Sequence, residues 1–112
     1  GLHTLYARSP KIEAVFACND QMALGAMQAA RRLGLRIPDD LAIVGFDDIP
    51  EAAYFYPSLT TVQQDVKALG ALAVEQMSKI IQANHNGENY NSDICWITPG
   101  LSVRQSSIKN NQ

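Results

Sequence analysis

The sequence predicts an α/β fold in which a parallel open sheet is flanked by helices. Two short and almost wholly apolar runs, at residues 14–18 and 41–46, have the length and composition of strands that are covered on both faces. A stretch with helical periodicity separates the two runs and completes one strand–helix–strand unit. Because such a unit returns to the sheet by a right-handed crossover, the two strands should be parallel.

A short helix should come before the first strand. Leu2, Leu5 and Tyr6 recur at helical spacing from the first residues of the chain. Pro10 should end this helix, because proline cannot continue a helix and also restricts the residue before it. A chain that opens inside a helix, without an initiator Met, is typical of a fragment, and we therefore expect further sequence upstream.

The helix between the two strands has clear start and stop signals. Asn19 and Asp20 can offer side-chain oxygens to the free amides of its first turn. Gly34 stands where a left-handed residue commonly ends a helix. The isolated Gly25 is expected to allow close packing of the helix on the sheet. The apolar face of this helix consists of Ala23, Met27, Ala30 and Leu33, widened by Leu24.

The second half of the chain is less regular. A turn at residues 38–40 leads into the second strand, and residues 49–56 should form one helical turn and a loop that Pro57 closes. Residues 59–63 are β-branched and short, as in a strand or an extended connection. Asp65 can cap a long helix. The apolar stripe of this helix consists of Val66, Leu69, Ala73, Met77 and Ile80.

The end of the chain is predicted to be mostly extended or irregular. A polar stretch without periodicity predicts a surface loop at residues 84–92. Extended pieces should follow at residues 94–97 and 101–103, separated by a Thr-Pro-Gly break. The polar tail from Ser106 is expected to fray.

Composition excludes several classes of function. The 112 residues fit one small domain, and nine basic against eleven acidic residues give a net charge of −2 with no basic stripe for nucleic acid. No apolar run approaches the ~18 residues of a membrane span, and the printed sequence does not open with a basic start followed by an apolar signal segment. Cys18 and Cys95 each lie in an apolar run and are expected to be reduced core thiols of a cytoplasmic protein. With His85 they come singly, without the paired spacing of a metal site.

Catalytic signatures are also missing from the sequence. It contains no glycine-rich phosphate loop and no serine nucleophile motif. Asp47 and Asp48 follow each other at the end of a strand, so their side chains should diverge and cannot work as a paired acid and base. We therefore expect no enzymatic activity, no metal and no cofactor.

Three segments in register resemble the lactose-repressor/galactose-repressor (LacI/GalR) family of bacterial transcriptional regulators. They are residues 16–26 (FACNDQMALGA), residues 34–48 with their GLRIPDD and VGFDD motifs, and residues 57–64 (PSLTTVQQ). A PGLSVR ending at residues 99–104 adds to the similarity. The resemblance implies the C-terminal part of an effector-binding core with a periplasmic-binding-protein-like type I fold, in which two α/β lobes are joined by three crossovers.

The resemblance also implies how the chain is organised. Residues 1–105 would form about one lobe, and within them the helix at residues 65–84 would pack on a first lobe that this chain lacks. DNA would be bound only through a helix-turn-helix domain that is absent here. Without the first lobe, the apolar stripe of this helix should fold back on its own lobe or dock on a second copy of the chain.

A ligand site is expected at one edge of the sheet. Asn19 and Asp47 each follow a buried strand, and parallel α/β sheets bind ligands beyond the carboxyl ends of their strands. The resemblance implies that both side chains bind hydroxyls or ring nitrogens of a small-molecule effector, a sugar or a nucleoside-like compound. It also implies that Gln64 contributes from the third crossover, with Val66 and Leu69 facing the pocket.

Each of these polar residues has a simpler interpretation. Asn19 stands where an ordinary helix N-cap is expected, and Asp20 could serve in its place. Asp48 suits a turn residue that caps the next helix. An exposed Gln64 beside a strand would by itself carry no functional meaning.

The aromatic residues at 54–56 offer two interpretations. At least one of the rings should pack on the local core. Aromatic rings are also enriched in the cores of subunit interfaces, and in the family this loop belongs to the dimer face. We therefore predict that Tyr54 and Phe55 take part in a homodimer contact.

Two other functions compete with a regulator. A periplasmic sugar-binding protein of an ABC transporter has a related fold, and a signal peptide upstream would distinguish it. A phosphoacceptor receiver domain also places carboxylates at the ends of parallel strands. A receiver needs a lysine beyond a later strand, and residues 59–64 contain none.

Overall fold

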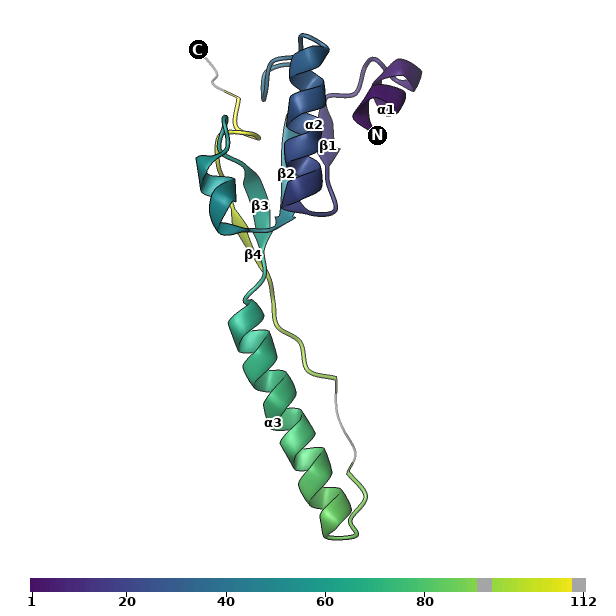
Figure 1. Ribbon diagram of the computed structural model, residues 1–112, viewed down its shortest axis with the longest axis vertical. Coiled ribbons are helices and arrows are strands. Elements are labelled where there is room, and N and C mark those ends of the chain that lie inside the picture. Colours follow the sequence, from purple (N-terminus) through teal and green to yellow (C-terminus); the bar gives the residue numbers. More distant parts are fainter. Residues whose placement is uncertain (91–93, 110–112) are drawn as a thin grey trace. The chain divides into compact units, whose positions relative to one another are not determined.

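Four strands form one open, mixed sheet in the order β1-β2-β3-β4 (Figure 1). The strands are β1 (Ala14–Phe16), β2 (Ala42–Asp47), β3 (Thr60–Gln63) and β4 (Gly100–Ser102). The computed structural model describes residues 1–90 and 94–109. It divides the chain into two units, one made of residues 1–64 with the segment from Gly100 onward, the other of Asp65–Pro99.

The predicted strand–helix–strand unit is confirmed. Strand β1 pairs in parallel with β2, and β2 pairs in parallel with β3. Strand β4 is antiparallel to β3, so the sheet is mixed and not wholly parallel. The pairing explains the reversal, because the chain leaves the sheet at Gln63 and re-enters it beside that residue at Gly100.

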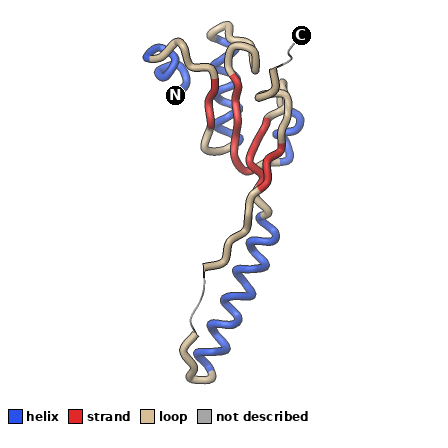
Figure 2. The backbone as a smooth tube through the Cα atoms, turned by 180° about the vertical axis from the view of Figure 1, so that it is seen from behind, coloured by secondary structure: helices blue, strands red, loops and turns tan. Residues whose placement is uncertain are grey.

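Helix α2 (Asp20–Arg32) has the caps that the sequence predicts. The side chain of Asn19 accepts a hydrogen bond from the amide of Met22 at 2.8 Å. Gly34 has a φ of 73°, and the amide of Leu35 donates to the carbonyl of Ala30 at 2.9 Å. Helix α2 packs against β2 on one face of the sheet (Figure 2). Its buried apolar residues are Ala23, Met27 and Ala30.

The core of the first unit lies between α2 and the sheet. The short helix α1 (Leu2–Arg8) and the 3₁₀ helix η1 (Pro50–Tyr54) each add one buried residue, Leu2 and Ala52. Strand β2 and its start contribute Leu41 and Ile43, and Leu59 comes from the start of β3. These three large side chains are fully buried.

Three expectations about burial are wrong. Strand β1 is an edge strand and is not covered on both faces, since two of its three residues are exposed and the side chain of Phe16 is 61% exposed. Cys18 and Cys95 are both exposed and are not core thiols. A Cβ on Gly25 would meet nothing within 4 Å, so close packing on the sheet does not explain this glycine.

The polar tail is ordered at its start, contrary to prediction. Ser106 is fully buried, its hydroxyl donates to the carbonyl of Ile43 at 2.6 Å, and it accepts from the amide of Thr60 at 2.8 Å. Ser107 lies 2.6 Å from the hydroxyl of Thr60. Residues 106 and 107 therefore fasten the chain to β2 and β3. Residues 110–112 of the predicted frayed tail lie outside the described residues.

The second unit contains the long predicted helix, α3 (Val66–His85). Asp65 caps it by accepting from the amide of Ala68 at 2.9 Å. The predicted extended piece at residues 94–97 has no strand, and Trp96 is exposed. Part of the loop predicted at 84–92 lies outside the described residues. The exposed large apolar residues of α3 are Val66, Leu69, Val74, Met77 and Ile81.

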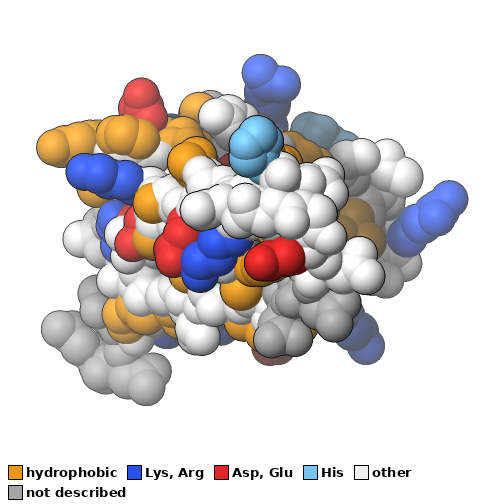
Figure 3. Space-filling view, turned by 90° about the horizontal axis from the view of Figure 1, so that it is seen from below, with side chains coloured by type: hydrophobic (Ala, Val, Ile, Leu, Met, Phe, Trp, Pro, Cys, Tyr) orange, Lys and Arg blue, Asp and Glu red, His pale blue; other side chains and the backbone are white. Residues whose placement is uncertain are grey.

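Charges are mixed on the surface. On the face shown in Figure 3, Lys and Arg side chains are scattered among acidic and hydrophobic ones and form no single patch. In the part of the chain that the structure describes, no helix combines the length and the hydropathy of a membrane span.

Candidate functional site

Polar side chains gather at the carboxyl edge of the three parallel strands. Asn19 and Asp20 follow β1, Asp47 ends β2, and Gln64 follows β3. Because β1, β2 and β3 run in the same direction, their carboxyl ends meet at one edge. This edge is where open α/β sheets bind ligands, and all four residues belong to the first unit.

Asp47 and Gln64 contact each other directly. The Nε2 group of Gln64 donates to Oδ1 of Asp47 at 3.2 Å, and both residues are partly buried. After this bond, the carboxylate still has acceptor sites, and the amide still has one N–H and its carbonyl oxygen. The pair can therefore accept from and donate to hydroxyls or ring nitrogens at the same point.

Asn19 acts as the N-cap of α2, as its simpler interpretation expected. The cap uses the side-chain oxygen, which leaves the amide nitrogen as a donor. A ligand role for this nitrogen is compatible with the cap and stays a prediction.

The turn after β2 has an unusual backbone. Asp47 has a φ of 121° and Asp48 has a φ of 57°. A left-handed conformation is uncommon for residues other than glycine, although Asp and Asn tolerate it better than most. Each such residue costs about 1–3 kcal/mol and persists only where the surroundings hold it. Such strain is often found at ligand-binding sites.

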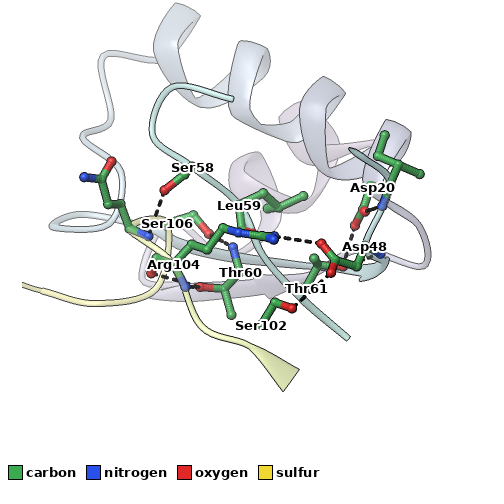
Figure 4. Close-up of polar contacts among 11 residues, drawn as sticks. Asp20, Asp48, Ser58, Leu59, Thr60, Thr61, Ser102, Arg104 and Ser106 are labelled. Carbon is green, nitrogen blue, oxygen red and sulfur yellow. Dashed lines mark hydrogen bonds and ion pairs between the residues drawn. The ribbon is translucent and has the colours of Figure 1, made fainter. Parts of the chain in front are cut away.

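Asp48 does not cap the next helix, so that expectation is wrong. The 3₁₀ helix η1 starts after Ile49, and no side-chain cap is found there. The carboxylate of Asp48 instead accepts from Nη1 of Arg104 at 2.9 Å and from the hydroxyl of Ser102 at 3.0 Å (Figure 4). The positive φ values at Asp47 and Asp48 direct this side chain toward β4 and the segment after it.

Asp20 is a fully buried carboxylate that the sequence did not single out as functional. Its Oδ1 accepts from the hydroxyl of Thr61 at 2.6 Å (Figure 4), and its Oδ2 accepts from the amide of Ile49 at 2.8 Å. Gly45 leaves room for it, because a Cβ at that position would collide with Oδ1 of Asp20. Asp20 therefore joins the start of α2 to β3 and to the loop after β2.

Sequence reasoning missed this network of Asp20, Thr61, Asp48 and Arg104. One signal was available: Thr61 lies in a short strand, where a buried hydroxyl needs a hydrogen-bond partner. Its partner, Asp20, is 41 positions away in the sequence. No local pattern identifies such a pair.

The other two predicted ligand-binding residues belong to the second unit. Val66 and Leu69 lie in the first turn of α3, in the unit Asp65–Pro99, and their side chains are 68% and 50% exposed. Their place in a ligand pocket stays a prediction. Among the described residues there is no group of His, Cys, Asp and Glu that could hold a metal ion.

The two aromatic residues predicted to take part in a homodimer contact have different surroundings. The ring of Phe55 packs against the hydrophobic core, whereas the side chain of Tyr54 is 86% exposed. The core explains Phe55 without a partner subunit. The predicted homodimer contact therefore depends mainly on Tyr54.

Comparison with known proteins gives consistent matches over nearly the whole chain. Residues 2–107 match the family described as the periplasmic binding protein-like domain. The ribose operon repressor of Haemophilus influenzae is 43% identical over 106 residues, which are 95% of this chain and 31% of the relative. The HTH-type transcriptional repressor PurR of Histophilus somni is 41% identical over 93 residues, 83% of this chain and 27% of the relative.

A solved structure shows the same fold. The Lac repressor dimer bound to operator and the anti-inducer ONPF superposes with a TM-score of 0.80 and 29% identity. The superposition covers 96% of this chain and 36% of that one. The chain thus spans about a third of the length of the proteins that it matches.

Proposed function

The chain belongs to the periplasmic binding protein-like domain family, among regulators of the LacI/GalR type, and we propose that it senses the effector of a bacterial transcriptional regulator. The observation that carries this proposal is the Asp47–Gln64 pair at the carboxyl edge of the parallel strands. Relatives named as repressors support a regulator rather than a transport protein. DNA contact would belong to a part of the regulator outside this chain, because Lys and Arg form no basic stripe.

The chemistry of the pair favours a small polar effector. A partly buried carboxylate accepts strong, charge-assisted hydrogen bonds from hydroxyls, as sugar recognition requires. The amide of Gln64 adds one donor and one acceptor beside it. We therefore propose a sugar, a related polyol or a nucleobase-like compound as the effector, with Asn19 contributing its amide. Val66 and Leu69 would supply apolar surface from α3.

A chimeric repressor tests this function. The matched segment of the Haemophilus influenzae ribose operon repressor is replaced by residues 2–107, and binding to ribose operator DNA is measured by fluorescence anisotropy. Each of D-ribose, lactose, adenosine and hypoxanthine is then added. We expect at least one compound to change operator affinity about tenfold, which corresponds to ~1.4 kcal/mol of coupling. An operator-binding chimera that no sugar or nucleobase affects would contradict the proposed effector class.

Self-association is the second expected property. We propose that the exposed ring of Tyr54 lies in a contact between two copies of the chain. Burial of such a ring in an interface removes a large apolar area from water and so stabilises the contact. Tyr54→Ala is expected to weaken dimerisation at least tenfold, measured by light scattering after size exclusion. Tyr90→Ala, at an exposed tyrosine of the second unit, is the control. A wild-type chain that remains a ~12 kDa monomer at high micromolar concentration would disprove self-association.

A further inference from the structure

The turn at Asp47 and Asp48 is held by groups from four parts of the chain. The amide of Asp48 donates to the hydroxyl of Thr61 at 3.3 Å, and the next amide, of Ile49, donates to Asp20 at 2.8 Å. The carboxylate of Asp48 is held by Ser102 and Arg104, as Figure 4 shows. Groups from the start of α2, from β3, from β4 and from the segment after β4 thus all fasten the same turn.

Arg104 fixes the turn against the start of β3. Its Nη1 group donates both to Oδ1 of Asp48 and to the carbonyl of Leu59, each at 2.9 Å. The side chains of Arg104 and Asp48 are only 23% and 13% exposed. Charge-assisted bonds in such a shielded place are stronger than those of an exposed ion pair.

Both carboxylate oxygens of Asp48 are engaged by other residues of the chain. One carboxylate oxygen accepts from Arg104 and the other from Ser102. Asp47, directly before it, accepts from Gln64 on Oδ1, and within residues 1–90 and 94–109 no side-chain bond to its other oxygen is found, which leaves that oxygen open to a ligand. The two adjacent carboxylates therefore have different tasks, one inside the network and one at the candidate site.

We propose that Asp48 and Arg104, supported by Asp20 and Thr61, are positioning residues that aim the carboxylate of Asp47 at Gln64 and at the effector. The direction of the Asp47 side chain depends on the positive φ values at Asp47 and Asp48. This backbone conformation would relax without the hydrogen bonds that hold the turn. Asp47 pairs in register with Gln63, so a shift of the turn changes the distance from Asp47 to the neighbouring Gln64. This inference rests on the proposed effector-sensing function.

The first test uses nuclear magnetic resonance on the chain itself. Asp48→Asn keeps the shape of the side chain but removes its charge, and Arg104→Lys keeps the positive charge but loses the planar guanidinium. We expect Asp48→Asn to shift or broaden the side-chain amide signals of Gln64 and the carboxyl signal of Asp47. Arg104→Lys should do so to a smaller extent. Asp39→Asn, at an exposed aspartate before β2, is the matched control and should leave both signals unchanged.

The second test uses the chimeric repressor and the compound, among D-ribose, lactose, adenosine and hypoxanthine, that changes its operator affinity most. Asp48→Asn is expected to weaken binding of that compound at least tenfold while operator affinity without the compound stays within about twofold. Should Asp48→Asn fail to fold, Ser102→Ala removes a single bond to Asp48 and should weaken the same binding about threefold.

The two tests distinguish a failure of the positioning role from a failure of the proposed effector-sensing function. Unchanged Asp47 and Gln64 signals in Asp48→Asn, or unchanged effector affinity, would overturn the positioning role. An equal loss of operator and effector binding would also overturn it, since that pattern indicates a general loss of structure. If no compound affects the chimera, the proposed function fails, and the resonance experiment still decides whether Asp48 and Arg104 position Asp47.

Discussion

Replacing Asp20 with alanine is expected to lower the free energy of unfolding by roughly 3–6 kcal/mol, because it removes two hydrogen bonds to a charged group, which are worth about 1.5–3 kcal/mol each. Asp20 is fully buried and accepts two such bonds, from the hydroxyl of Thr61 and the amide of Ile49. The substitution leaves both donors in the protein interior without an acceptor. A loss of this size is a large share of the stability of a small domain.

Urea unfolding of the chain, followed by far-ultraviolet circular dichroism, measures this loss. Asp20→Asn keeps the volume and one acceptor oxygen and should cost about half as much. Asp39→Ala removes an exposed aspartate and should change stability by less than about 0.5 kcal/mol. A loss below about 1 kcal/mol for Asp20→Ala would mean that the buried network contributes little to the fold.

The second large effect concerns function. In the chimeric repressor, Asp47→Asn is expected to abolish the effector response at ordinary effector concentrations while leaving operator binding in place. The amide keeps the shape of the side chain but replaces an acceptor oxygen with a donor group, which mismatches the hydroxyls of the ligand. One lost bond to a charged group, worth ~1.5–3 kcal/mol, weakens binding by about tenfold or more.

The change in operator affinity, measured over a range of effector concentrations, quantifies this loss. Asp39→Asn is the control for removal of one negative charge elsewhere in the same unit. Gln64→Ala should give a smaller loss, since it removes one donor from the carboxylate and leaves the charge in place. A normal response from Asp47→Asn would show that Asp47 is a turn residue without contact to the effector.

Local patterns predicted the elements of the fold well. The caps at Asn19, Gly34 and Asp65 are confirmed, as are Ala23, Met27 and Ala30 of the apolar face of α2, because each depends on residues within a few positions of one another. Leu24, which was expected to widen this face, is 37% exposed. Strands β1 and β2 were recognised from their apolar runs. The edge position of β1 was not, because the sequence of a strand does not say which of its sides has a neighbour.

The contacts that hold the candidate site join distant parts of the chain. Asp48 and Arg104 are 56 positions apart, and Ser106 is 63 positions from its acceptor Ile43. The sequence therefore pointed to Asp47 and Gln64 through a resemblance, and it placed Asn19 and Asp47 at one edge of the sheet because each follows a strand. It assigned Asp48 to a cap and the tail to a frayed end, because their partners can be identified only in the folded chain.

A crystal structure of the chimeric repressor with the compound that changes its operator affinity tests the central claim most directly. We predict the compound at the carboxyl edge of β1, β2 and β3. A carboxylate oxygen of Asp47 should lie within about 2.5–3.2 Å of a hydroxyl or N–H of the compound, with Gln64 in contact with the same molecule. A compound bound elsewhere, with Asp47 and Gln64 paired only to each other, would contradict the claim that this pair senses the effector.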